Sequence, residues 1–281
     1  MKKAVINACC SLGVDVDGTE LASELITSHI KNDIYSIKSI NIKENKSKLK
    51  NLKALNDFNS KLYSQVLDVL DKDMLPITVG GDHSIAIATA LASIKKYNNL
   101  GIIWFDSHGD FNDSLTTITG NIHGLPLAVI TGFENKHLAD FHNGKKYNYK
   151  NTVIVGARDL DELEKENLKK CNITVFTTED IKKYGALAIC QKAFQIASNN
   201  TLGVHVSYDI DLIDPELAPG VSVPAKNGIS KEDAYQIVDD IIKHKNIIKS
   251  LDIVEFNPLK DKDNITLNIT KEIFNKIYNN L

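Results

Sequence analysis

Short apolar runs rich in valine and isoleucine alternate with stretches that are apolar at every third or fourth residue, along the whole of this 281-residue sequence. The short runs are typical of buried strands and the longer stretches of amphipathic helices. The expected strands are Ala4–Ala8, Ile34–Ile42, Pro76–Val79, Gly101–Phe105, Thr152–Val155, Thr174–Phe176, Leu202–Tyr208 and Ile247–Val254. The expected helices are Leu52–Leu70, Ile85–Lys96, Glu162–Lys170, Ala186–Ala197, Lys231–Lys243 and Ile269–Tyr278. This alternation predicts repeated βα units, a parallel sheet and therefore an α/β fold.

The pattern leaves two architectures open, an open sheet covered on both faces and a closed eight-stranded barrel. Both place functional residues in loops at the carboxyl ends of strands. No shift in composition and no proline-rich linker marks a boundary, so residues 1–281 are expected to form one domain. The lysine-rich run Lys43–Lys50 is interpreted as a solvated face.

Composition argues against nucleic acid and against a membrane as partners. The chain has 33 basic and 36 acidic residues, and Arg158 is its single arginine. Duplex-binding surfaces rely on arginine, so nucleic acid is not expected as a partner. No apolar run is long enough to span a bilayer, and the apolar segment after Met1 is interpreted as a first buried strand rather than a secretory signal. A cytoplasmic location is therefore expected.

Potential metal ligands follow an apolar run at Asp106, His108 and Asp110. In an extended backbone, residues separated by two positions project to the same side, so these side chains are expected to converge at the end of a strand. Buried carboxylates cost several kcal/mol per charge unless cations or hydrogen bonds compensate. A metal site is therefore favoured over a purely structural cluster.

Two further strands end in similar residues. Asp209 and Asp211 follow the run that ends at Tyr208, while Asp214 precedes a proline and is expected in a turn or beside the ligands. His205, inside the run, is interpreted as a core histidine. After Val79, two glycines permit a sharp turn that brings His83 to the sheet edge, although Asp82 or Ser84 could simply cap the next helix.

Together these segments offer two histidines and four aspartates, namely His83, Asp106, His108, Asp110, Asp209 and Asp211. Four carboxylates balance two divalent cations, and hard oxygen ligands with some imidazole suit Mn²⁺. Two such ions can activate a water molecule as a nucleophile at neutral pH.

These motifs resemble the ureohydrolase family, and within it the arginases. The likeness extends from Ser11-Leu12-Gly13 to the segment Asp252–Pro258 and includes all three metal motifs in the family's order. It implies a three-layer αβα sandwich with an eight-stranded, mostly parallel sheet. It also implies two Mn²⁺ ions per subunit, hydrolysis of the guanidinium group of L-arginine to L-ornithine and urea, and a homo-oligomer, either trimer or hexamer.

The resemblance also assigns roles outside the metal motifs. It implies substrate carboxylate contacts for Asn112, Thr119 and Asn121, and substrate ammonium contacts for Asp161 and Glu164 in the loop that contains Arg158. It implies that Asp110 passes a proton to the leaving amine, that His123 is a proton shuttle, and that Glu255 anchors the guanidinium. The alternatives are a capping role for His123 and a solvated strand end for Glu255. Arg158 is expected to fix its loop through neighbouring carboxylates or carbonyls.

One segment departs from the arginase pattern. The loop Pro219–Pro224 lacks the threonines usual there in arginases and resembles formimidoylglutamase. The sequence therefore favours an arginase, with agmatinase or formimidoylglutamase as alternatives and a catalytically inactive metal-binding protein as a remote one.

Overall fold

The computed structural model describes residues 2–39, 48–134 and 137–281. Its strands are β1 (Lys3–Cys9), β2 (Ile34–Lys38), β3 (Leu75–Val79), β4 (Gly101–Phe105), β5 (Thr152–Ala157), β6 (Thr174–Thr177), β7 (Val204–Asp209) and β8 (Ile248–Val254). Each expected strand is found, and residues 40–42 of the expected second strand lie outside the described residues.

The strands form one sheet in the order β2-β1-β3-β8-β7-β4-β5-β6, and every neighbouring pair is parallel. β2 and β6 are its two edges, so the sheet is open and the barrel alternative is excluded. The family resemblance implied a mostly parallel sheet, and the eight strands described are parallel throughout.

The α-helices of the described residues are α1 (Ala22–Thr27), α2 (Leu52–Asp71), α3 (Ala86–Tyr97), α4 (Pro126–Thr131), α5 (Glu162–Lys170), α6 (Thr178–Tyr184), α7 (Ala186–Ala197), α8 (Lys231–Lys243) and α9 (Ile265–Asn280). Sequence periodicity missed α1, α4 and α6, because segments of six or seven residues make fewer than two turns. No helix in residues 2–39, 48–134 and 137–281 has the length and apolarity needed to cross a membrane.

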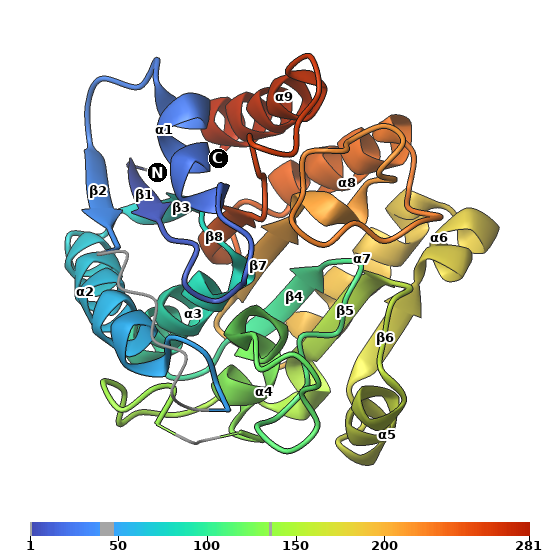
Figure 1. Ribbon diagram of the computed structural model, residues 1–281, viewed down its shortest axis with the longest axis horizontal. Helices are drawn as coiled ribbons and strands as arrows, with labels where there is room; N and C mark the ends of the chain where they lie inside the picture. The colour runs from blue at the N-terminus through green and yellow to red at the C-terminus, as the bar shows by residue number, and fades with distance from the viewer. Residues whose placement is uncertain (1, 40–47, 135–136) are drawn as a thin grey trace.

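The helices cover the sheet on both faces and form a three-layer αβα sandwich (Figure 1). α2, α3, α4 and α5 lie on one face, and α1, α6, α7, α8 and α9 on the other. Alternate strand residues supply the two cores: Ile6 packs in the first and Val5 in the second, both fully buried.

Candidate active site

The predicted ligands come together at the carboxyl ends of the four central strands. β3, β8, β7 and β4 are neighbours in that order, and parallel strands end at the same edge of a sheet. His83 follows β3, Glu255 follows β8, Asp209 ends β7 and Asp106 follows β4. The strand order therefore brings residues that are far apart in the sequence together in one cluster.

Aspartate side chains turn the backbone at three of these strand ends. In each case Oδ1 accepts a hydrogen bond from the backbone N–H two residues later: Asp82 from Ser84 at 3.0 Å, Asp106 from His108 at 2.6 Å, and Asp209 from Asp211 at 2.7 Å. Such turns satisfy backbone groups that the sheet no longer pairs. The same aspartates thereby shape the loops. The second oxygens of Asp106 and Asp209 point to Nδ1 of His83, whereas that of Asp82 accepts the backbone N–H of Gly13 at 2.9 Å.

This geometry corrects one detail of the sequence interpretation. Asp106, His108 and Asp110 do not lie on one side of an extended strand, because β4 ends at Phe105 and Asp110 has a φ of +49°. They converge because the chain turns twice after the strand.

Asp106 lies at the centre of the cluster and belongs to two groups of potential metal ligands. One group is His83, Asp106 and Asp110, and the other is Asp106, His108 and Asp211. Within each group the ligand atoms all lie within 4.8 Å of one another. The arrangement therefore offers two adjacent cation positions that share one carboxylate.

The first of these groups fits a divalent ion closely. Nδ1 of His83 lies 2.9 Å from an oxygen of Asp106 and 3.1 Å from oxygens of both Asp110 and Asp209. Ligands held at about 2.1 Å by one octahedral ion are about 3 Å apart. Nδ1 of His83 and Oδ2 of Asp110 are buried 3.1 Å apart, and neither atom makes a well-aligned hydrogen bond to a described residue, as expected of atoms that face a cation.

The pKa values of the cluster also indicate that a positive charge would stabilise it. Burial, with the charge of Asp106 second, raises the pKa of Asp110 to about 6. Burial likewise raises the pKa of Asp209 well above its usual range. Burial lowers the pKa of His83, but its carboxylate neighbours outweigh this and raise the pKa well above the ordinary value. A bound cation would satisfy these carboxylates without protonation.

Two residues that the sequence analysis did not single out hold ligands in place. Trp104 donates its indole N–H to Oδ2 of Asp106 at 2.9 Å and stacks on the His83 ring with centroids 4.0 Å apart. Ser207 lies 2.9 Å from Nε2 of His83, which leaves Nδ1 to the carboxylates. Each precedes a ligand aspartate by two positions on a strand, so the period of two was an available signal.

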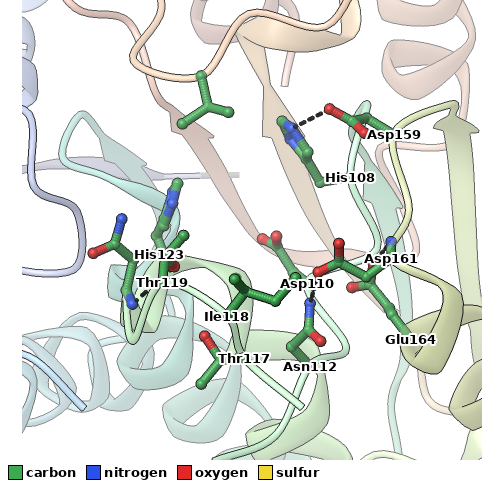
Figure 2. Close-up of a pocket in the computed structure, with 13 residues that line it drawn as sticks. His108, Asp110, Asn112, Thr117, Ile118, Thr119, His123, Asp159, Asp161 and Glu164 are labelled. Atoms are coloured by element: carbon green, nitrogen blue, oxygen red, sulfur yellow. Dashed lines mark hydrogen bonds and ion pairs between the residues drawn. The ribbon is translucent and has the colours of Figure 1, made fainter. Parts of the chain in front are cut away.

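A cavity of ≈ 330 Å³ opens beside the cluster and is lined by His108 and Asp110. It is also lined by the residues assigned to the substrate carboxylate and ammonium and by the assigned proton shuttle, namely Asn112, Thr119, Asn121, His123, Asp161 and Glu164. Glu255, assigned to the guanidinium, is not among the lining residues and contacts His123 instead. In Figure 2 His123 and Thr119 lie on one side and Asp161 and Glu164 on the other, with Asp110 between them. One pocket thus unites the metal cluster with both sets of assigned polar groups.

His123 and Glu255 form a pair at the edge of this pocket. Nδ1 of His123 lies 3.1 Å from Oε1 of Glu255, which also accepts the backbone N–H of His83 at 2.7 Å. Glu255 is 3% exposed, which excludes the solvated strand end, and the His123 side chain pairs with it rather than capping α4. Burial lowers the pKa of His123, but the hydrogen bond and charge of Glu255 outweigh this and raise it to about 8.

The residues assigned to substrate contact are also bonded to one another. Nδ2 of Asn112 donates to Oδ2 of Asp161 at 3.1 Å. Glu164 accepts the backbone N–H groups of Phe111 at 2.8 Å and Asp161 at 3.3 Å. Burial raises the pKa of Glu164 to about 8. Glu164 therefore braces the loop after Asp110 as well as lining the pocket.

Arg158 is bonded to backbone carbonyls, one of the two alternatives expected for it. NH2 donates to the carbonyls of Asp211 at 2.6 Å and Ala225 at 2.9 Å, and NH1 to that of Leu212 at 3.2 Å. The single arginine thereby ties its own loop to the segment that follows β7.

Asp214 and His205 lie where the sequence analysis expected them. Asp214 accepts the N–H groups of Glu216 at 2.9 Å and Gly228 at 2.8 Å, and so forms a turn. His205 is fully buried and bonds Asp252 at 3.0 Å, as a satisfied core histidine does.

The atypical loop Pro219–Pro224 reaches the pocket through one side chain. Val223 lines the cavity, while Ser222 accepts a hydrogen bond from Asn257 at 3.0 Å. The departure from the arginase pattern therefore places an aliphatic group at the pocket wall.

Known proteins resemble the chain over nearly its whole length. The Arginase family model matches residues 5–279. An arginase of Staphylococcus aureus (strain COL) is 36% identical over 267 residues, which cover 91% of this chain and 88% of the relative. The solved arginase of Bacillus cereus superposes with a TM-score of 0.90 at 32% identity, covering 99% of this chain and 98% of that one. The arginase of Entamoeba histolytica, solved in complex with L-ornithine, also gives a TM-score of 0.90, at 27% identity with the same coverage.

Proposed function

The chain belongs to the arginase family and is a ureohydrolase-type amidinohydrolase, and we propose that it hydrolyses the guanidinium group of L-arginine to L-ornithine and urea. The observation that carries this proposal is that Asn112, Asn121 and Asp161 line the same pocket, beside the Asp106 cluster. A guanidino substrate with a carboxylate and an ammonium at its far end has complementary groups at both ends of that pocket.

Two divalent ions, Mn²⁺ by the nature of the ligands, complete the proposed site. His83, Asp110 and Asp209 would hold one, His108 and Asp211 the other, and Asp106 both. When bound, such a pair of ions lowers the pKa of water and supplies a hydroxide nucleophile at neutral pH.

The protein's own groups orient the substrate and move protons. Glu255 anchors the guanidinium, next to His123. Asp110 lines the pocket and passes a proton to the departing amine, and His123 exchanges protons with solvent at the pocket edge. With a pKa of about 8, the His123 ring exists in both protonation states near neutral pH, which suits a shuttle.

Recognition of the far end of the substrate decides between related reactions. Asn112, Thr119 and Asn121 receive the carboxylate, and Asp161 and Glu164 the ammonium. Agmatine lacks the carboxylate and would leave those amide and hydroxyl donors without a partner. The complex of the E. histolytica arginase with L-ornithine supports the same choice of substrate.

One observation favours a second candidate, formimidoylglutamase. Val223 lies in the loop Pro219–Pro224, which resembles that enzyme, and it lines the pocket. Formimidoylglutamate carries two carboxylates, and the charge of Asp161 would repel the second of them. We therefore rank it below L-arginine.

The test supplies Mn²⁺-loaded protein with L-arginine, agmatine and formimidoylglutamate in parallel and measures urea and formamide. The proposal expects urea from L-arginine at the highest kcat/KM. Faster turnover of agmatine would reassign the protein as an agmatinase, and faster turnover of formimidoylglutamate as a formimidoylglutamase. Turnover of none, with two ions bound per chain, would indicate a binding protein.

On the family likeness we also propose that residues 1–281 form one domain in a cytoplasmic homo-oligomer, either trimer or hexamer. Sedimentation equilibrium of the Mn²⁺-loaded protein tests the assembly, and a monomer at micromolar concentration would contradict it.

A further inference from the structure

A short segment before α2 is fastened to the loop that carries the assigned carboxylate contacts. Nζ of Lys48 donates to the carbonyl of Leu115 at 3.0 Å, and the backbone N–H of Lys50 to the carbonyl of Gly120 at 3.0 Å. Gly120 has a φ of +76°, and a Cβ there would lie 2.2 Å from the carbonyl oxygen of Lys48. The fit between the two segments therefore depends on glycine at this position.

The side chain of Lys50 reaches further, to a residue that lines the pocket. Its Nζ lies 3.1 Å from Oδ1 of Asn121 and forms an ion pair with Asp15. An ammonium group has donors and no acceptor, so it fixes the oxygen of Asn121 toward Lys50. The amide nitrogen of Asn121, with its two donors, is thereby turned away from Lys50.

The orientation of the Asn121 donors matters because the pocket is acidic. The ionisable residues that line it are His108, Asp110, His123, Asp159, Asp161 and Glu164. The aspartates among them attract a guanidinium and an ammonium but repel a substrate carboxylate. Lys50 is paired with Asp15, so it brings hydrogen-bond donors rather than net positive charge to the Asn121 side of the pocket, and its side chain is only 26% exposed.

We propose that Lys50 is a positioning residue that determines specificity, because it holds Asn121 with its amide donors toward the pocket and so favours guanidino substrates that carry an α-carboxylate. The proposal rests on the proposed function and names a residue through which that function selects its substrate. Lys50 acts on the substrate through Asn121, and its effect is therefore confined to ligands with the carboxylate.

Lys50→Met tests this by removing the donor and the charge while keeping the aliphatic stem. The expected result is a KM for L-arginine raised about tenfold with little change in kcat, and unchanged constants for agmatine. Lys50→Arg, which retains a donor-only cation, should restore most of the loss. Lys48→Met is the matched control, because it breaks a contact of the same segment that does not involve Asn121, and it should keep the wild-type preference for L-arginine over agmatine.

Calorimetric binding of L-ornithine and of putrescine, its decarboxylated counterpart, provides a readout that does not depend on turnover. Lys50→Met should weaken L-ornithine binding about tenfold and leave putrescine unaffected. An equal effect on both ligands, or none on either, would overturn the role of Lys50. If the protein does not hydrolyse L-arginine but Lys50→Met still weakens the binding of L-ornithine and not of putrescine, the proposed reaction would be wrong and the role of Lys50 would stand.

Discussion

His123 and Glu255 are joined at the pocket edge, with Nδ1 of the histidine 3.1 Å from Oε1 of the glutamate. The same oxygen accepts the backbone N–H of His83. Glu255 thus links the assigned proton shuttle to the backbone of an assigned metal ligand. Because burial alone would lower the pKa of His123, the value of about 8 depends on this carboxylate.

Glu255→Gln should lower the pKa of His123 in metal-free protein from about 8, since burial is then opposed only by the smaller effects of the charges of Asp110 and Asp82. Titration of the histidine ring nitrogens by NMR measures it, with His123→Asn to assign the signal. A pKa that stays near 8 in Glu255→Gln would show that another group sets it.

The same pair makes the stability of the metal-free protein depend on pH. The folded-state pKa of His123 lies above its ordinary value of 6.5, so the pair's contribution is complete below pH 6.5 and is lost as pH rises through 8. The contribution is about 2 kcal/mol. Urea unfolding should show a gap between wild type and Glu255→Gln that narrows from pH 6 to pH 9, and a constant gap would contradict the coupling.

Trp104→Phe should weaken Mn²⁺ binding about 10- to 100-fold, because Asp106 loses the donor that orients it. Competition with a metal indicator measures the affinity. Tyr208→Phe is the control, since this buried hydroxyl on the neighbouring strand has no hydrogen-bond partner among the described residues. Equal Mn²⁺ affinities in both variants would show that Trp104 does not contribute to metal binding.

Asp209→Ala should reduce bound Mn²⁺ below two ions per chain, because Asp209 lies against Nδ1 of His83. Asp214→Ala, five residues away, should keep both ions, because Asp214 only accepts two backbone N–H groups in a turn. Elemental analysis of the purified variants gives the metal content. Full metal content in Asp209→Ala would contradict its assignment as a ligand.

Arg158→Lys should lower the free energy of unfolding by about 1–3 kcal/mol, since one ammonium cannot replace a guanidinium that reaches several carbonyls. It should also raise the KM for L-arginine, because Arg158 holds the loop before Asp161. Denaturant unfolding and steady-state kinetics test both parts. Wild-type values in both would show that the guanidinium is incidental.

Most helices and strands of the fold could be predicted from the local pattern of apolar residues. The eight strands and six longer helices were predictable because their apolar periodicity is strong, although the last helix begins at Ile265, four residues before its expected start. The order of the strands was not, since β3, β8, β7 and β4 become neighbours through contacts between distant segments. The short helices α1, α4 and α6 carry too few turns to show a period.

The candidate site divides in the same way. Ligand types and their place after strands were readable from the sequence, but the turns that bring Asp106, His108 and Asp110 together depend on side chain to backbone bonds. Lys50 falls in a run interpreted as a solvated face. Its partner Asn121 is 71 residues away, and no local pattern links the two.

The central claim is that L-arginine is hydrolysed at the Asp106 cluster by a pair of divalent ions. The most direct test titrates metal-stripped protein with Mn²⁺ while following bound metal and urea release from L-arginine in the same samples. The account predicts no urea without metal and a rate that reaches its maximum as two ions bind per chain. Urea release by the stripped protein, or two ions bound with no urea release, would contradict it.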